Sequence, residues 1–321
     1  MSVLLETVGL KKYFSTPAGS LHAVDNIHLT INEGETLGVV GESGCGKSTL
    51  GRTILRLMEP TAGEIRFGGQ DICRLSRREM KKTRMDMQII FQDPYSSLDP
   101  RMSVKELVKE PLLIHRVYGS SAEREQAVLT LMDKVGLARR FADSYPHELD
   151  GGRRQRIGIA RALALHPKFI VCDEPVSALD VSIQAQILNL LMDLQDEMNL
   201  TYLFITHDLS VVRHISNHIM VMYLGQCIER APAEEIFERP LHPYTKALLG
   251  AIPKPNLSAR GKKALVIRGE VTSPIDPKPA CRFAARCEHC TEACTQREFS
   301  LRELEPGHFV ACNLYEGGGH V

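Results

Sequence analysis

The sequence has 321 residues, and 43% of them are hydrophobic, which is enough to build the core of one large domain and a smaller one. Lys and Arg together number 39, as do Asp and Glu, so the formal net charge is zero. This balance argues against a nucleic-acid-binding protein, which usually carries a basic excess.

The N-terminal segment Met1–Phe14 has only a short apolar stretch, which does not resemble a signal peptide. No segment approaches the roughly 18 continuous apolar residues of a transmembrane helix. We therefore expect a soluble, cytoplasmic protein, and other chains would have to hold it at a membrane if it works there.

The first part of the chain has the pattern of a β-rich region that ends in a helix. Apolar residues alternate with polar ones, a Pro/Gly/Ser turn follows the first strand, and Pro60 stops the helix. The predicted strands are residues 4–13, 23–31, 36–40, 63–72 (a pair with a Gly-Gly turn) and 88–91, and the predicted helix is 47–58.

The second part alternates between helices and apolar strands. Residues 104–161 are mostly helical in pattern, and the strands predicted at 168–172, 201–206 and 219–224 are separated by helices at 182–198 and 208–216. Strands that alternate with helices indicate an α/β fold with a mainly parallel sheet. The helical block at about 95–165 is predicted to be an inserted subdomain.

The composition changes near Gly250, where prolines become frequent. We therefore predict one domain over residues 1–250 and a small C-terminal extension over residues 251–321.

A glycine-rich loop follows the strand at 36–40 and fits G-x-x-x-x-G-K-[ST] at every fixed position. Its glycines let backbone amides surround phosphate oxygens, and the following helix N-terminus adds positive potential. We expect Lys47 to reach the β- and γ-phosphates of ATP and Ser48 to ligate Mg²⁺. The loop consists of Gly41, Glu42, Ser43, Gly44, Cys45, Gly46, Lys47, Ser48 and Thr49.

Acidic residues end the apolar strand at 168–172, and a histidine follows the next strand. Asp173 is placed to hold Mg²⁺, and Glu174 is the candidate for polarising the attacking water. His207 is a further candidate, because the ends of parallel strands converge on one crevice. A solvated acidic turn and a structural histidine are the alternatives.

Five cysteines lie within the last 41 residues, spaced C281-x5-C287-x2-C290-x3-C294-x17-C312. In a chain without an export signal such a cluster favours metal binding over disulfides. Four thiolates suit either Zn²⁺ or an iron–sulfur cluster, and free thiols are the third possibility.

These motifs together resemble the ATP-binding-cassette (ABC) ATPases over about residues 3–250. The resemblance makes Gln92 the glutamine that senses Mg²⁺ and contacts the membrane subunit, Tyr13 the aromatic that stacks on adenine, and Asp180 the D-loop aspartate. It makes His207 the residue that touches the γ-phosphate and Glu174 the catalytic carboxylate. The segment at the position of the family's signature sequence is Leu149, Asp150, Gly151, Gly152 and Arg153.

The resemblance is closer still to the dipeptide and oligopeptide importer branch. Residues 91–100, 173–182 and 242–249 carry it, together with the cysteine-rich extension. It implies the second of two non-identical ATPase subunits, paired as a heterodimer at the cytoplasmic face of the inner membrane. It also implies two transmembrane permeases and, indirectly, an extracytoplasmic peptide-binding protein, with no nucleic acid. Nickel, glutathione and opine importers belong to the same branch, so the cargo stays open.

The extension resembles one associated with a [4Fe–4S] cluster, which would be held by Cys281, Cys287, Cys294 and Cys312, with Cys290 extra. Zinc is the alternative to that cluster.

The signature segment departs from the family pattern Leu-Ser-Gly-Gly-Gln at Asp150 and Arg153. In the family this segment closes over the ATP of the opposite subunit, where its serine donates to the γ-phosphate. Asp150 would add a negative charge there, which Arg153 would partly offset, unless Asp150 turns away. A regulatory subunit that binds ATP but hydrolyses it poorly is therefore an alternative. A soluble ABC protein in DNA repair or translation is another, although the single cassette and short insert argue against it.

Overall fold

The computed structural model describes residues 2–251 and 273–316, which form two compact units. The first, here the helical unit, contains Asn32–Glu35 and Arg74–Ile205. The second, here the P-loop unit, contains Val3–Ile31, Thr36–Cys73 and the described chain from Thr206 onward. The C-terminal extension therefore belongs to the same unit as the glycine-rich loop.

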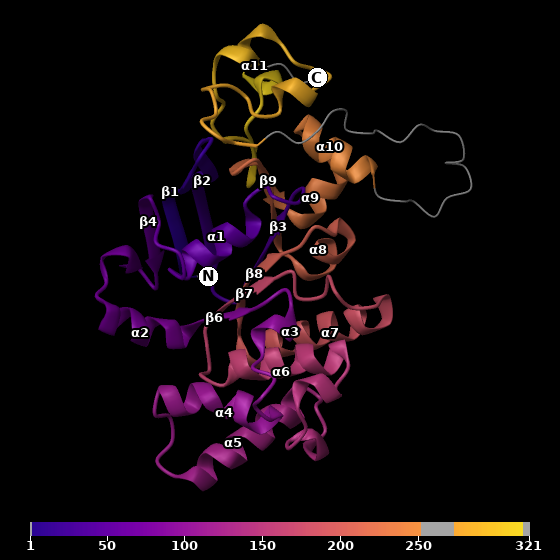
Figure 1. The fold of residues 1–321 in the computed structure, drawn as a ribbon. Helices are drawn as coiled ribbons and strands as arrows, with labels where there is room; N and C mark the ends of the chain where they lie inside the picture. The colour runs from indigo at the N-terminus through magenta and orange to yellow at the C-terminus, as the bar shows by residue number, and fades with distance from the viewer. Residues whose placement is uncertain (1, 252–272, 317–321) are drawn as a thin grey trace, which may run out of the picture. The chain divides into compact units, whose positions relative to one another are not determined.

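The P-loop unit contains a four-stranded sheet in the order β2-β1-β4-β5 (Figure 1). β1 pairs antiparallel with β4, and β4 turns into β5 through Gly68 and Gly69, which both have positive φ. This confirms the predicted Gly-Gly turn. The strands are β1 (Val3–Thr16), β2 (Gly19–Asn32), β4 (Ala62–Phe67) and β5 (Gln70–Asp71).

A second set of strands in this unit positions the glycine-rich loop. β3 (Thr36–Val40) runs parallel to β9 (His218–Tyr223), which pairs antiparallel with β10 (Gln226–Pro232). From the extension, β12 (His308–Val310) pairs with β10, and β11 (Arg302–Glu305) pairs with β12. The helices are α1 (Lys47–Ile54), α8 (Leu209–Ile215), α9 (Ala233–Glu238), α10 (Pro243–Gly250) and α11 (Glu292–Gln296).

The core of the P-loop unit explains why the extension stays with it. Phe283 is 3% exposed and packs edge-on against Tyr223 of β9 and Tyr244 of α10. These three rings belong to one cluster of buried residues. Aromatic rings of this size remove a large apolar area from water, and edge-to-face packing adds to that gain.

The helical unit is built on three parallel strands, with β7 (Phe169–Asp173) between β6 (Met87–Ile90) and β8 (Thr201–Ile205). β7 and β8 are buried throughout, which is typical of strands covered on both faces. The helices are α2 (Arg77–Asp86), α3 (Pro94–Ser97), α4 (Val104–Ile114), α5 (Ser121–Lys134), α6 (Gly151–Leu163) and α7 (Val181–Met198), of which α4 packs against both α5 and α6 (Figure 1).

Several helices differ from the prediction: α9, α10 and α11 were not predicted, and α1 and α2 differ for reasons the structure shows. α1 ends at Ile54 rather than Met58, because Arg56 adopts a φ of 49° and the amides of Leu57 and Met58 both bond to the carbonyl of Arg52. α2 was not predicted. It starts at a capping box formed by Ser76 and Glu79, but buries little beyond Met80 and so lacks an apolar stripe.

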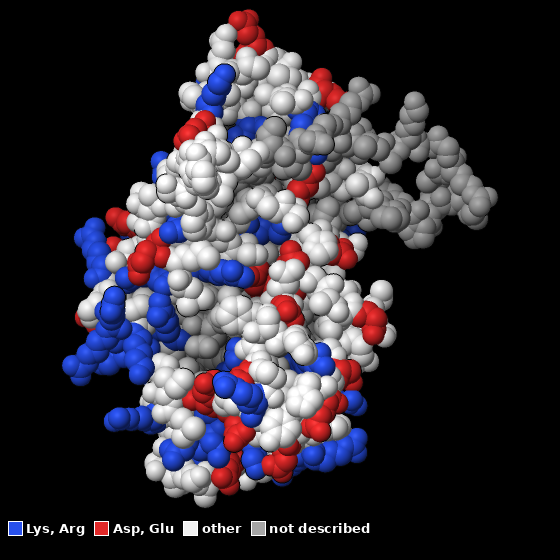
Figure 2. Space-filling view, in the orientation of Figure 1, with Lys and Arg blue, Asp and Glu red and all other residues white. Residues whose placement is uncertain are grey.

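Charge is distributed unevenly although the net charge is zero. Figure 2 shows Lys and Arg gathered over α2, whose exposed basic residues are Arg77, Arg78, Lys81 and Lys82. Among the helices described, none is both long enough and apolar enough to cross a membrane.

Candidate functional site

The glycine-rich loop joins the end of β3 to the start of α1, as the motif requires. Gly46 precedes the helix with a φ of 105°, and a Cβ at this position would lie 1.9 Å from the carbonyl oxygen of Ala23. Only glycine fits, because another residue would be both strained and in collision with backbone. The loop is therefore fixed tightly against β2.

Lys47 is the first residue of α1 and is 5% exposed. Its Nζ donates to the carbonyl oxygens of Gly41 at 2.8 Å and Glu42 at 3.1 Å. The ammonium group thus lies within the curve of the loop, beside the amides at the N-terminus of α1. Such an arrangement binds phosphate groups. Ser48 is half-buried on the same helical turn.

Tyr13 lies on β1 in the same unit. Its ring stacks on His22 with centroids 3.7 Å apart, and its hydroxyl donates to Asp25. Burial and this hydrogen bond raise the pKa of Tyr13. Burial would raise the pKa of Asp25 as well, but the bond from Tyr13 and the charge of Arg282 lower it. Asp25 is therefore a carboxylate that fixes the ring of Tyr13.

His207 also belongs to the P-loop unit, where it is exposed. It directly precedes Asp208, whose carboxylate caps α8 by accepting from the amides of Ser210 and Val211. The backbone around His207 is thereby fixed while its ring remains accessible.

The helical unit brings Gln92 and Glu174 together. The amide nitrogen of Gln92 donates to the carboxylate of Glu174 at 3.0 Å, although 82 residues separate them. Glu174 has a φ of 48°, which is uncommon for a residue other than glycine, and its amide bonds to the carbonyl of Ile205. Backbone strain of this kind is concentrated at functional sites. Asp173, one residue earlier, ends β7 and is 1% exposed.

The segment after Glu174 leads into α7. Ser177 donates its hydroxyl to the carbonyl of Glu174, and Asp180 caps α7 by accepting from the amide of Ile183. Both bonds shape the turn that carries the D-loop residue predicted from the sequence.

The signature segment begins α6, and Asp150 is its cap. The carboxylate of Asp150 accepts from the amide of Arg153 at 2.8 Å and forms an ion pair with the guanidinium of Arg153 at 2.7 Å. Leu149 is buried, and Asp150, Gly152 and Arg153 line a hollow of about 310 Å³ with Phe141. The offset by Arg153 that we expected is therefore present within the chain.

The four predicted cysteine ligands lie in one region of the extension. Burial, together with the nearby thiols of Cys287 and Cys294, raises the pKa of Cys281 and of Cys312 to about 11. Cys290 is exposed. Within residues 2–251 and 273–316, however, no three His, Cys, Asp or Glu side chains are arranged to hold a metal ion.

Several residues that bear on the loop carried no motif in the sequence. Arg286 binds Glu42, Arg282 binds Asp25, and the hydroxyl of Tyr244 accepts from the amide of Glu42. As many as 257 residues separate these partners, so no local pattern indicates them.

Two family models match this chain. The model described as "ABC transporter" matches residues 24–177, and the model described as "Oligopeptide/dipeptide transporter, C-terminal region" matches residues 228–294. The first match includes the glycine-rich loop, Gln92, the signature segment and Glu174. The second includes Cys281, Cys287 and Cys294.

Curated relatives are similar along nearly the whole chain. The oligopeptide transport ATP-binding protein AppF of Bacillus subtilis is 50% identical, over 97% of each chain. The dipeptide transport ATP-binding protein DppF of Haemophilus influenzae is 48% identical, over 96% of each.

Solved structures of ATP-binding cassettes have the same fold. A dimeric cassette in a post-hydrolysis state with ADP and Pi is 32% identical, with a TM-score of 0.66 over 72% of this chain and 99% of that one. The cbiO1 protein of Clostridium perfringens, part of an ABC transporter complex, is 29% identical, with a TM-score of 0.66 over 75% of this chain and 93% of that one.

Proposed function

Because this chain belongs to the ABC transporter ATP-binding proteins of the oligopeptide and dipeptide branch, we propose that it hydrolyses ATP to power the import of di- or oligopeptides. The observation that carries the proposal is the glycine-rich loop, with the ammonium of Lys47 held in its curve at the start of α1. The identity of about half the residues to peptide-transport ATPases, over both family regions, supports the cargo class.

The residue roles follow from the chemistry of each group. Lys47 and the loop amides bind the phosphates, and Ser48 and Asp173 supply oxygen ligands for Mg²⁺. Glu174 polarises the attacking water, and Gln92, which donates to its carboxylate, holds that carboxylate in place. Tyr13 provides an aromatic face for the adenine, and His207 contacts the γ-phosphate.

The partners follow from the reaction. A subunit that powers transport needs transmembrane permeases, and we propose two of them, with this chain at the cytoplasmic face of the membrane. A second, homologous ATPase subunit would complete a heterodimer in which its phosphate site meets the Asp150–Arg153 segment of this chain. An extracytoplasmic peptide-binding protein would deliver the cargo.

We further propose that Cys281, Cys287, Cys294 and Cys312 hold a [4Fe–4S] cluster. Four thiols that lie near one another supply the ligand number that such a cluster takes. The arrangement described here is not that of bound ligands, so the side chains would have to reorient on binding. Iron and acid-labile sulfide in anaerobically purified protein would support the cluster, and zinc in their place would support the alternative ion. Protein that contains neither iron nor zinc would contradict both assignments.

The experiment that tests the function compares two variants in the complex purified with its permeases. Lys47→Ala should lose nucleotide affinity, because the phosphates lose their cation. Glu174→Gln should keep ATP binding while turnover at this chain's site falls at least about 100-fold, because the water loses its acceptor. Glu197→Gln, an exposed carboxylate of α7 paired with Lys134, is the matched control and should behave as wild type.

Uptake of labelled peptides by vesicles containing the complex identifies the cargo. Uptake of nickel, glutathione or opines instead would reassign the cargo within the branch. Peptide uptake with wild-type turnover in the Glu174→Gln complex would point to the partner's site as the working one and leave this chain a regulatory subunit.

A further inference from the structure

An arginine of the C-terminal extension reaches the glycine-rich loop. The guanidinium of Arg286 forms two hydrogen bonds with the carboxylate of Glu42, at 2.7 and 3.0 Å. The side chain of Arg286 is 7% exposed and that of Glu42 is 23% exposed, so the pair is largely shielded from solvent. Two parallel bonds between a guanidinium and a carboxylate give a strong, oriented contact.

Glu42 is held at its backbone as well. Its amide donates to the hydroxyl of Tyr244 at 2.9 Å, and its carbonyl accepts from Lys47 at 3.1 Å. Arg286 also donates to the hydroxyl of Tyr223 at 3.3 Å, and Tyr223 packs against Tyr244. Glu42 is therefore held by hydrogen bonds with α10, with the extension and with Lys47 of the same loop.

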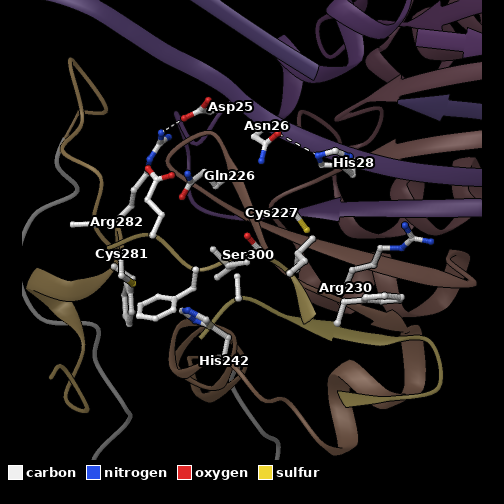
Figure 3. Close-up of a pocket in the computed structure, with 18 residues that line it drawn as sticks. Asp25, Asn26, His28, Gln226, Cys227, Arg230, His242, Cys281, Arg282 and Ser300 are labelled. Carbon is white, nitrogen blue, oxygen red and sulfur yellow. Dashed lines mark hydrogen bonds and ion pairs between the residues drawn. The ribbon is translucent and has the colours of Figure 1, made fainter. Parts of the chain in front are cut away.

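A second arginine, four residues earlier, anchors the extension to the strand beside Tyr13. Arg282 pairs with Asp25, whose other carboxylate oxygen accepts from the hydroxyl of Tyr13, and Arg282 also donates to the carbonyl of Leu224. Arg282 and Asp25 line a cavity of about 400 Å³, together with other residues of the extension, β2 and β10. Figure 3 shows the contact between their side chains.

We propose that Arg286 is a positioning residue for ATP binding, which holds Glu42 in place and neutralises its carboxylate beside the phosphate site, with Arg282 acting in parallel on Tyr13. Nucleotide affinity of this chain thereby depends on its C-terminal extension. The proposal rests on the function proposed above for the glycine-rich loop, because it assumes that the loop binds the phosphates.

The expected effect of Arg286 on ATP binding is electrostatic. A triphosphate is strongly negative, and a carboxylate in the loop that binds it repels it unless a cation compensates. Arg286 supplies that cation in a fixed geometry. Without it, Glu42 would keep its charge and gain rotational freedom, so the loop would bind ATP less tightly and in more than one conformation.

The test is a double-mutant cycle on the full-length chain, with the dissociation constant of Mg-ATP measured by displacement of a fluorescent ATP analogue. Arg286→Ala should weaken ATP binding roughly tenfold, and Arg286→Lys, which keeps the charge but not the paired bonds, should weaken it by about threefold. In a Glu42→Gln background, Arg286→Ala should change the affinity by less than about twofold, since no carboxylate is left to neutralise.

Two further variants show whether a change in ATP affinity is specific to Arg286. Arg297→Ala removes another arginine of the extension, which pairs with Glu316, and should leave ATP affinity unchanged. Lys47→Ala should abolish binding. If it does while Arg286→Ala binds within about twofold of wild type, the role of Arg286 is wrong and the loop assignment stands.

An equal loss from Arg286→Ala in the wild-type and Glu42→Gln backgrounds would also overturn the proposal, because it would indicate a structural role independent of the Glu42 charge. Arg286→Lys keeps the test decisive should Arg286→Ala not fold. Wild-type affinity in that variant would show that the oriented contact is not needed.

Discussion

Asp150 and Arg153 neutralise each other at the first turn of α6, where the carboxylate of Asp150 both caps the helix and pairs with the guanidinium of Arg153. The family pattern has serine and glutamine at these two positions, and neither of those side chains carries a charge. In the heterodimer proposed above, the ATP of the partner subunit would meet this ion pair rather than a hydroxyl donor.

We predict that the partner's site binds ATP but turns it over slowly, because the donor to the γ-phosphate is missing. Asp150→Ser with Arg153→Gln should raise hydrolysis there several-fold, whereas Arg153→Gln alone should lower it, because the carboxylate loses its neutralising partner. The measurement is the residual ATPase rate of the complex with this chain's own site disabled by Glu174→Gln. Equal residual rates with the unchanged signature segment and with both signature variants would show that Asp150 and Arg153 are tolerated without consequence.

Gln92 should matter for turnover more than for binding. Gln92→Ala removes the hydrogen bond to Glu174, so the carboxylate loses a constraint on its orientation, and we expect kcat of the complex to fall roughly tenfold with KM for ATP changed less than about twofold. Gln88→Ala is the control and should keep wild-type kcat, because the side-chain amide of Gln88 on β6 donates to the carbonyl of Arg84 at the end of α2. A Gln92→Ala complex with normal kcat would contradict the role.

Gly46 should tolerate no side chain. In Gly46→Ala the new Cβ would meet the carbonyl oxygen of Ala23, so we expect a loss of at least about 2 kcal/mol of unfolding free energy, together with ATP binding. Gly68→Ala is the matched control: its φ is also positive, at 54°, but no atom lies within 4 Å of the added Cβ. It should cost about 1 kcal/mol. Urea denaturation of both variants measures the two losses of unfolding free energy. A larger loss in Gly46→Ala would indicate the collision with Ala23, and equal losses would indicate backbone strain alone.

Stability should fall as the pH drops below the ordinary pKa of histidine, because of His242. Burial lowers the pKa of His242 to about 4, although the nearby charge of Glu229 opposes this. The folded pKa lies below the unfolded value of about 6.5, so the unfolded chain binds more protons between pH 6.5 and 4. The stabilisation is complete above about pH 6.5, and roughly 2 kcal/mol of it is lost by pH 5.

His242→Asn should remove that part of the pH dependence while still accepting from the amide of Tyr244, because asparagine is a good helix cap. Urea midpoints at pH 7 and pH 5 check this. If the His242→Asn variant shows the same difference between its urea midpoints at pH 7 and pH 5 as the wild type, groups other than His242 cause the pH dependence.

The sequence indicated the parts of the fold that depend on local pattern. β3, α7 and β8 were predicted to within a residue, because a buried strand and an amphipathic helix each carry their own periodicity. The glycine-rich loop and the acidic end of β7 were predicted equally well, since their chemistry needs residues that are close together in the chain.

Contacts between distant segments were not predictable in this way. Nothing near Glu42 indicates that Arg286 would bind it, because the pairing depends on how the extension packs on Tyr223 and Tyr244. The pairing of Gln92 with Glu174 likewise depends on two neighbouring strands ending together, which periodicity does not reveal. α2 was missed for a different reason: it is mostly solvated, so its capping box was its main signal.

The addition of β12 and β11 to β10 has a consequence for how this chain avoids aggregation. A chain ending after α10 would leave the amides and carbonyls of β10 without these neighbours, and an exposed strand edge is a template for pairing with other molecules. The full chain ends this sheet at β11 instead, where Arg302 and Glu303 are exposed charges. β12 and β11 thus act as a charged border, and a chain truncated after α10 would expose β10 to pairing with other molecules.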